Sequence, residues 1–557
     1  MSTRRRVVVF GIDGGTMSLV GPWAKRGELP HLARLIASGT SGALRSTIHP
    51  LTPQAWTTFL TGVNPGKHGV FDFGRRREGS YELTLTDARS RRAPAIWSYL
   101  EPHGLTTGLL NVPLTFPLEP VHGFQVSGMH TPELAEAVGP RSLLDEILEV
   151  APDYRIDVMS PWYEEIGPFL DDVHHMTRER ARVAVRLYEK RRPDLFIMVM
   201  VGVDRVSHAL YEQMSHPDNH GRDGRGGWRY SGEVLRAYQA IDRALGQLLQ
   251  VLEDDTVVMV MSDHGFGSLS RDVSLNQFFL EQGLMSFSPQ KVRPRLPVEG
   301  VPAGAAGRTA AQAVVDGLRR AIPPLRWYDD SRIRRGQIPL ALRRWEYIDW
   351  QRTVAYSHGF FGNVYINLKG REPEGCVEPA DYERVRRQVA DRLEVALTDP
   401  DDGGRIVDHI YRREELYSGP FLAEAPDLVL VMRGYSYITR GGSELSATEI
   451  VAPPKVTHTG NHRLDGMLIL WGPGIRQGVK LQQASIMDLM PTILHMLGVP
   501  VPSQVDGRVL GEALERSEHL VAMARRLLAP EEHGGRRLSA MEERLVRRRL
   551  RNLGYFE

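Results

Sequence analysis

Three short runs of apolar residues occur along the chain without alternation of polar and apolar positions, and an aspartate follows each run within two residues. The runs are 7–12 before Asp13, 195–203 before Asp204, and 257–261 before Ser262 and Asp263. Such runs, rich in Val, Ile and Met, are typical of central strands in a parallel sheet that helices cover on both faces. Since ligands of such sheets bind beyond the carboxyl ends of the strands, we expect the three carboxylates to meet at one edge.

Segments with helical periodicity lie between the predicted strands, at residues 178–190 and 232–253. This alternation predicts an α/β fold, with a mostly parallel sheet sandwiched by helices. Residues 271–345 include several prolines and a Gly/Ala-rich stretch at 299–316, which indicates an insertion. The predicted organisation is a first part of a catalytic core at 1–270, a cap with some core strands at 271–450, the return of the core at 451–512, and a helical tail at 513–557.

Strand-like and helical sequence returns inside the predicted cap. The expected strands are 347–350, 364–368 and 427–431, and the expected helix is 380–397. In the Arg-rich tail, Leu520, Met523 and Leu527 recur at helical spacing. This spacing favours a helix that packs on the core or forms a homodimer over an arm that binds nucleic acid.

Three histidines are placed where they can join the aspartates. His208 lies four residues after Asp204, so a helix that begins near Asp204 turns both side chains to the same side. His264 directly follows Asp263, and two nearby glycines permit the backbone to bend both side chains inward. His462 comes from a Gly-rich turn, and a histidine in such a turn is more often solvated than bound to a metal.

Several short motifs occur in an order that one known superfamily shares. They are GIDG at 11–14, PLTPQAWTTFLTG at 50–62, PGKHG at 65–69, DRVSH at 204–208, SDHG at 262–265, GNH at 460–462 and DLMPTIL at 488–494. With these motifs the chain resembles the alkaline phosphatase superfamily, and within it the type I phosphodiesterase/nucleotide pyrophosphatase group and its bacterial phosphohydrolase and phosphomutase relatives. The resemblance covers most of the chain and implies an alkaline-phosphatase-like core with an inserted cap.

The resemblance also implies two divalent metal ions and a threonine nucleophile. One ion would be held by Asp13, Asp263, His264 and the oxygen of Thr52, and the other by Asp204, His208 and His462. The family nucleophile lies nine residues before the Thr of a Thr-Gly pair, which here selects Thr52 over Thr57 and Thr58. His458 competes with His462 for the second ion, and His462 is preferred. Mixed oxygen and nitrogen ligands favour Zn²⁺ and also admit Mn²⁺ or iron.

One departure from the family pattern concerns substrate binding. In the nucleotide pyrophosphatases an Asn shortly after the His-Gly pair contacts the phosphoryl oxygens, and no Asn follows that pair here. Asn64, Lys67 and Asn111 are the nearby candidates for its replacement. A cation or amide beside Thr52 would stabilise phosphoryl charge. An anionic Asp72, if it faced the site, would disfavour a dianionic monoester and favour a diester.

Composition excludes other classes of protein. Sulfatases of the superfamily make their nucleophile from a Cys or Ser in a different motif, and the only cysteine, Cys376, lies far from Thr52 in the sequence. Lys and Arg number 69 against 68 Asp and Glu, so no net charge favours nucleic acid or an anionic membrane. No stretch reaches the ~18 apolar residues of a membrane helix, and the first apolar run is too short for a signal peptide. We therefore expect no membrane span and a cytoplasmic location.

Together these features predict a two-metal phosphohydrolase, most consistent with a phosphodiesterase that acts on a small phosphate ester through a phospho-threonine at Thr52. Two alternatives keep the same residues: a metal-dependent phosphomutase, and a hydrolase of phosphonates or phosphate monoesters. A noncatalytic binding protein is disfavoured because all six acidic and histidine ligands are present. The substrate itself depends on cap residues that the sequence does not place.

Overall fold

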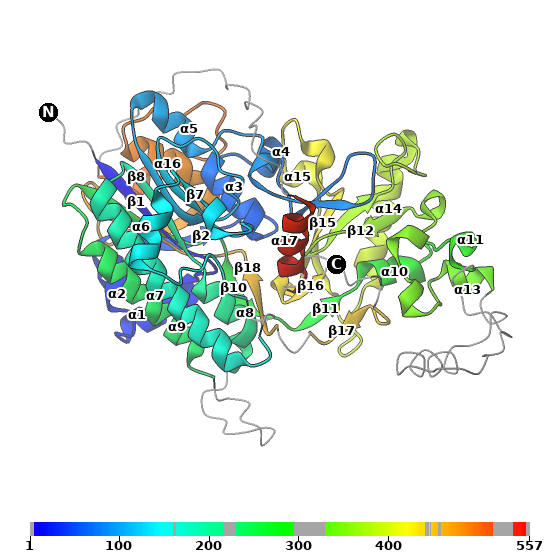
Figure 1. Ribbon diagram of the computed structural model, residues 1–557. Helices are drawn as coiled ribbons and strands as arrows, with labels where there is room; N and C mark the ends of the chain where they lie inside the picture. Colours follow the sequence, from blue (N-terminus) through cyan, green and yellow to red (C-terminus); the bar gives the residue numbers. More distant parts are fainter. Residues whose placement is uncertain are drawn as a thin grey trace.

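The computed structural model describes residues 5–159, 163–214, 230–293, 329–439, 445, 447–454, 458–515 and 539–552. A large α/β core lies beside a smaller second body, which residues between 271 and 452 form for the most part (Figure 1). No helix in these described ranges combines the length and the apolar character that crossing a bilayer requires.

The core is built on a nine-stranded sheet. In spatial order its strands are β20 (Lys480–Ser485), β2 (Thr40–Arg45), β19 (Leu468–Trp471), β9 (Thr256–Met261), β1 (Arg6–Ile12), β8 (Leu195–Met200), β5 (Thr107–Val112), β6 (Gly123–Ser127) and β7 (Val138–Gly139). Strands β9, β1, β8, β5 and β6 are parallel, whereas β19 runs antiparallel to both of its neighbours. The three apolar runs form β1, β8 and β9, which are adjacent, so the predicted parallel core is confirmed.

Helices cover both faces of this sheet (Figure 1). One face carries α1 (Met17–Lys25), α2 (Pro30–Ser38), α6 (Leu143–Val150), α7 (Ile166–Arg191), α8 (Gly202–Met214) and α9 (Glu233–Leu249). The other carries α3 (Thr52–Thr61), α5 (Ile96–Leu100) and α16 (Leu489–Met496), and the short α4 (Pro65–His68) follows α3. The predicted helix at 232–253 agrees with α9, whereas α7 begins twelve residues before its predicted start at 178.

A glycine in β1 allows α3 to approach the sheet closely. A Cβ atom at Gly11 would lie 2.7 Å from Cη2 of Trp56 and 3.2 Å from the carbonyl oxygen of Met198. Trp56 belongs to α3 and is completely buried, so its ring has little room to move. We expect Gly11→Ala to lower the free energy of unfolding by about 1–3 kcal/mol, measured by urea denaturation. Gly232→Ala is the control, because no atom of the described residues lies within 4 Å of the added methyl group. An equal loss in both variants would contradict the packing argument.

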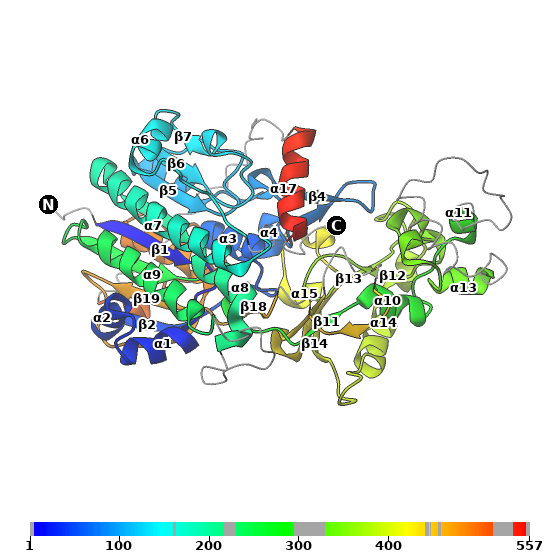
Figure 2. The same ribbon diagram turned by 60° about the horizontal axis from the view of Figure 1, so that its bottom comes forward.

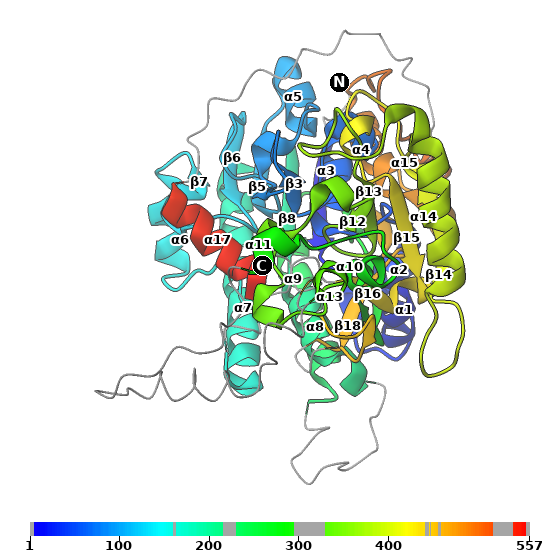
Figure 3. The same ribbon diagram turned by 90° about the vertical axis from the view of Figure 1, so that its right-hand side faces the viewer.

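The second body has an apolar core of its own. Its antiparallel sheet contains β12 (Ala355–Ser357), β13 (Asn363–Ile366), β15 (Leu428–Met432) and β14 (Val407–Arg412), and its three-stranded sheet contains β16 (Tyr437–Thr439), β11 (Arg271–Val273) and β17 (Val451–Ala452). Its helices are α10 (Leu275–Glu281), α11 (Pro289–Val292), α13 (Asp330–Arg334), α14 (Tyr382–Ala396) and α15 (Arg413–Leu416). Helix α14 lies along the four-stranded sheet (Figure 3).

Three of the predicted cap elements are found close to their expected places, as β13, β15 and α14. The strand predicted at 347–350 is wrong, because short 3₁₀ turns occupy 345–347 and 350–352. In these turns the rings of Trp345 and Trp350 stack with centroids 5.8 Å apart, and Trp350 also stacks on Tyr81 at 3.5 Å. Trp350, an aromatic residue of the predicted strand, therefore packs in a cluster with Trp345 and Tyr81. The Gly/Ala-rich stretch at 299–316 lies outside the described residues.

The last described helix, α17 (Ala540–Asn552), stands between the core and the second body (Figures 1 and 2). Val546 is 1% exposed and belongs to an apolar cluster with Leu51 of the core and Phe361 of the second body. Arg547 donates a hydrogen bond of 2.7 Å to the carbonyl oxygen of Leu83, in the hairpin of β3 (Gly74–Arg76) and β4 (Leu83–Leu85). The apolar residues predicted to form a helix at 520–527 lie outside the described residues.

Candidate metal centre

Strand ends, one helix and one short antiparallel strand bring the predicted acidic and histidine residues to one place. Asp13 follows β1, and Asp263 and His264 follow β9. We call Asp13, Asp204, His208, Asp263, His264 and His462 the acid–histidine cluster. All six side chains are buried.

Two members of the acid–histidine cluster come from elements that differ from the sequence interpretation. Strand β8 ends at Met200 and α8 begins at Gly202, so the first turn of the helix, rather than a strand end, presents Asp204. His462 lies in a short strand, β18 (Gly460–Arg463), rather than in a turn. This strand pairs with β10 (Gly265–Ser268) and places His462 opposite Phe266. Ladder pairing therefore fixes the backbone of His462.

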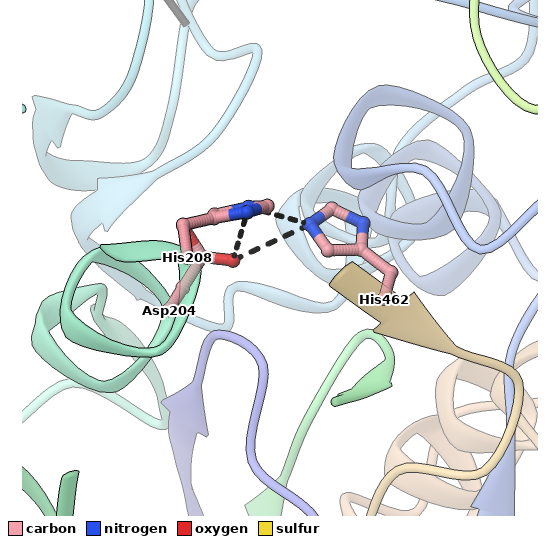
Figure 4. Close-up of side chains that lie close together, drawn as sticks. All are labelled: Asp204, His208 and His462. Atoms are coloured by element: carbon pink, nitrogen blue, oxygen red, sulfur yellow. Dashed lines mark hydrogen bonds and ion pairs between the residues drawn. The ribbon is translucent and has the colours of Figure 1, made fainter. Parts of the chain in front are cut away.

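Asp204, His208 and His462 face one another across the junction of α8 and β18 (Figure 4). Oδ1 of Asp204 lies 3.4 Å from Nε2 of His208 and 3.4 Å from Nε2 of His462. The two Nε2 atoms are 3.0 Å apart. Three potential ligand atoms thus surround a single point.

Hydrogen bonds fix the tautomer of every histidine in the acid–histidine cluster. The Nδ1 atoms of His208, His264 and His462 lie 3.1, 3.1 and 2.8 Å from the carbonyl oxygens of Gly460, Gly265 and Pro50. Because a carbonyl oxygen only accepts, each Nδ1 carries the proton and each Nε2 of a neutral ring offers a lone pair. Burial lowers the pKa of His264 and of His462, which keeps both rings neutral. Facing lone pairs repel each other unless a cation or proton lies between them.

His264 connects the histidines to the nucleophile predicted from the sequence. Its Nε2 atom lies 3.3 Å from Oδ2 of Asp263, 3.6 Å from Oδ1 of Asp13 and 3.4 Å from Oγ1 of Thr52. Asp13, Asp204 and His264 also have ligand atoms within 4.8 Å of one another. Asp204 therefore belongs to both groups, one with His208 and His462 and the other with Asp13 and His264.

The carboxylates of the acid–histidine cluster have oxygens that the described residues do not satisfy. Both oxygens of Asp13, Oδ1 of Asp204 and Oδ2 of Asp263 are buried without a hydrogen-bond partner in the described part of the chain. Burial raises the pKa of Asp13 well above its usual range, and repulsion from Asp263 and Asp204 adds to the shift. Buried, mutually repelling carboxylates are costly unless cations compensate them. The residues present therefore fit a site for divalent metal ions.

Comparison with known proteins identifies the family. The sequence profile of the type I phosphodiesterase/nucleotide pyrophosphatase family matches residues 7–465. The chain belongs to this family. It is accordingly a phosphoric ester hydrolase with a fold of the alkaline phosphatase type.

One solved structure with a similar fold is human ectonucleotide pyrophosphatase/phosphodiesterase 5. It shares 12% sequence identity with the chain, and the match covers 92% of this chain and 100% of the human one with a TM-score of 0.50. At this identity the likeness shows the fold alone. The comparison with curated proteins found no match.

For this family member, the hydroxyls that compete with Thr52 are engaged in hydrogen bonds, one within α3 and one with His68 of α4. Oγ1 of Thr57 donates to the carbonyl oxygen of Pro53 at 2.7 Å, and Oγ1 of Thr58 lies 2.9 Å from Nε2 of His68. The competing histidine, His458, has its ring centroid 6.0 Å from that of His208. Of the two histidines, His462 is the one whose ring nitrogen lies within 4.8 Å of the ligand atoms of Asp204 and His208 in that group.

All three candidates for substrate binding have protein partners; Nδ2 of Asn64 donates to Oδ2 of Asp506 at 2.9 Å, and the other two are Lys67 and Asn111. The ammonium group of Lys67 pairs with the carboxylate of Asp506 and donates to the carbonyl oxygen of Gln504 at 3.0 Å. Nδ2 of Asn111 donates to the carbonyl oxygen of Ser127 at 3.2 Å, while its Oδ1 accepts from the hydroxyl of Tyr154. Within the described chain, the structure brings neither Lys67 nor Asn111 into the acid–histidine cluster.

Asp72 connects the core to the second body instead of facing the cluster. Its carboxylate accepts hydrogen bonds from the backbone N–H of Phe73 at 2.6 Å, the backbone N–H of Phe360 at 3.2 Å and Nδ2 of Asn363 at 3.1 Å. Burial raises the pKa of Asp72 to about 7 despite these hydrogen bonds. The repulsion of a dianionic substrate by Asp72 therefore does not follow from this geometry.

The raised pKa of Asp72 predicts a dependence of stability on pH. The folded state binds a proton at Asp72 more tightly than the unfolded state, so this group contributes stability below about pH 4 that is lost as pH rises through 7. Each pKa unit corresponds to roughly 1.4 kcal/mol. In Asp72→Asn this loss should be absent, measured as the difference in unfolding free energy between pH 5 and pH 8. Equal pH slopes in the variant and the native protein would contradict the assignment.

Sequence reasoning assigned no role to two residues beside the acid–histidine cluster, Arg205 and Asp157. Arg205 lies inside the DRVSH motif, and its position directly after the candidate ligand Asp204 is the sequence signal that could have identified it. Asp157 lies in no motif, and it meets Arg205 from 48 positions away in the sequence. Only the fold identifies it.

Proposed function

We propose that the chain is a two-metal phosphodiesterase with Thr52 as its nucleophile. The observation that supports this most strongly is the convergence of three Nε2 lone pairs and three carboxylates beside Oγ1 of Thr52. Imidazole and carboxylate groups that are buried and poorly satisfied are suited to metal binding and poorly suited to a structural role.

The residues divide into two ligand sets. Asp13, Asp263, His264 and Thr52 would hold one ion, and Asp204, His208 and His462 the other. Zn²⁺ is our preferred metal because the ligands mix nitrogen with oxygen, and Mn²⁺ is the second choice. When bound, such ions lower the pKa of a coordinated hydroxyl and stabilise charge on phosphoryl oxygens.

We infer that Thr52 attacks the phosphorus atom of the substrate. It is the first residue of α3, where the helix dipole and the N–H groups of the first turn favour a negatively charged phosphoryl group. In the proposed reaction its hydroxyl loses the proton, a bond forms between Oγ1 and phosphorus, and the bond from phosphorus to the leaving alcohol breaks as that oxygen gains a proton. Water then cleaves the phospho-threonine, which releases the phosphate monoester and restores the hydroxyl.

The charges around the acid–histidine cluster favour a diester as substrate. A diester carries one negative charge, whereas a monoester carries nearly two at neutral pH. The two basic side chains considered above, Arg205 and Lys67, are both paired with carboxylates. Neither side chain therefore offers an uncompensated positive charge to the second negative charge of a monoester.

A substrate screen tests the proposed function. The purified protein, loaded with Zn²⁺ or Mn²⁺, is assayed with an aryl phosphate diester, the matched monoester and a phosphonate ester. We expect kcat/KM for the diester to exceed that for the monoester at least tenfold, with the monoester accumulating as product. A preference for the monoester would contradict the diesterase proposal. Return of the phosphoryl group to another oxygen of the substrate would identify a phosphomutase.

A further inference from the structure

Arg205 lies next to a proposed metal ligand and is almost fully buried. Its side chain is 4% exposed. Nε and Nη2 donate to Oδ1 and Oδ2 of Asp157 at 2.9 and 2.8 Å, while Nη1 donates to Oδ2 of Asp204. Because the contact with Asp157 uses two parallel hydrogen bonds, it fixes the plane of the guanidinium group.

This arrangement leaves one oxygen of Asp204 for other partners. Oδ2 accepts from Arg205, whereas Oδ1 is buried without a hydrogen-bond partner in the described chain and lies 3.4 Å from Nε2 of both His208 and His462. The guanidinium group thus sets the rotation of the carboxylate. A rotation about the Cβ–Cγ bond would break the contact with Arg205.

Arg205 also distinguishes Asp204 from the other acids of the acid–histidine cluster. Of the three carboxylates in the acid–histidine cluster, Asp204 is the one that accepts a hydrogen bond from Arg205 in the described chain. Asp157 balances the charge of Arg205, so the pair adds no net charge to the site.

The pair is shielded from solvent by a part of the chain that carries no site motif. Asp157 lines a cavity of about 10 Å³ together with Met159 and with Val546 of α17. A space of this size is at the lower limit for one water molecule. The side chains of Arg205 and Asp157 are 4% and 10% exposed, so little water reaches the hydrogen bonds between them.

We propose that Arg205 and Asp157 are positioning residues that hold Asp204 as a single-oxygen ligand of the second metal ion. The inference rests on the proposed metal site and adds the groups that orient one of its ligands. Residues that orient metal ligands typically change metal affinity or activity by about 10- to 100-fold when they are replaced.

The charge-balanced double variant Arg205→Met with Asp157→Asn tests this role. It removes one positive and one negative charge together, so any change in metal affinity reports orientation rather than net charge. In the full-length metal-free protein we expect the affinity for the second Co²⁺ ion to fall about 10- to 100-fold, with the first ion unaffected within about threefold. The visible absorption of Co²⁺ should change as well, because the freed Asp204 can bind through both oxygens.

Two further variants complete the experiment. Arg182→Met is the control, since Arg182 is 55% exposed and pairs with Glu179 on the surface of α7; we expect no change in metal affinity. Arg205→Lys keeps the positive charge but lacks the two parallel hydrogen bonds of the guanidinium group. Its affinity for the second ion should lie between those of the double variant and the native protein. If the double variant does not fold, Arg205→Lys alone should still weaken the second ion about tenfold.

The outcomes separate this inference from the proposed function. Unchanged affinity and an unchanged Co²⁺ spectrum in a folded double variant, or in Arg205→Lys where the double variant does not fold, would overturn the positioning role while leaving a two-metal enzyme intact. Failure of the native protein to bind a second ion would overturn both. Turnover is not needed for either conclusion.

Discussion

Thr52→Ala is expected to abolish nearly all turnover while the fold and both metal ions are retained. The variant removes the attacking oxygen but leaves Asp13, Asp263 and His264 beside the vacated position, so the remaining ligands still hold the ion. We expect kcat/KM to fall by about three orders of magnitude or more, as for other lost nucleophiles. The measurement is kcat/KM with an aryl diester, together with metal analysis and circular dichroism of the same preparation.

Thr57→Ala is the matched control for this prediction. Thr57 lies in the same helix, and its hydroxyl donates within the helix to the carbonyl oxygen of Pro53 at 2.7 Å. Its loss should cost about 1 kcal/mol of stability at most and leave turnover within about tenfold of native. If Thr57→Ala were inactive and Thr52→Ala active, the nucleophile would have to be reassigned.

His462→Ala is expected to remove one of the two ions and to lower turnover by orders of magnitude. His462 supplies one of the three ligand atoms around a single point, and Asp204 and His208 alone make an incomplete site. The substitution also leaves the carbonyl oxygen of Pro50 without its hydrogen bond from Nδ1. Metal content by mass spectrometry, with kinetics on the same sample, measures both effects.

His458→Ala provides the comparison. The ring of His458 lies beside that of His208, with centroids 6.0 Å apart. We therefore expect its loss to disturb the orientation of His208 and to lower turnover roughly 10- to 100-fold. The reverse order of effects would transfer the ligand role to His458 and keep the two-metal mechanism. Retention of both ions in both variants would mean that another residue completes the second site.

The parts of the fold that follow from local sequence were predicted well. The runs at 7–12 and 257–261 contain uninterrupted apolar residues, and they form β1 and β9 because strands covered by helices on both faces are rich in apolar side chains. The spacing of Asp204 and His208 predicted their common face, since four residues make about one helical turn. The resemblance to the family then predicted that the residues of these separate elements form one site.

The parts that depend on distant partners could not be predicted. Whether Lys67 faces the substrate is decided by Asp506, which lies 439 positions further along the chain. Whether Asp72 faces the site is decided by Phe360 and Asn363 of the second body. A motif specifies which residue types are present, but the tertiary contacts decide which of them are free to bind a ligand.

The number of metal ions per chain tests the central claim most directly. Purified protein is stripped of metal, reloaded with Zn²⁺, freed of excess ion by gel filtration and analysed by mass spectrometry against protein concentration. The proposed site predicts two ions per chain, because Asp204 with His208 and His462, and Asp13 with Asp204 and His264, each have possible ligand atoms within 4.8 Å of one another. Fewer than about one ion per chain after loading would contradict the two-metal account.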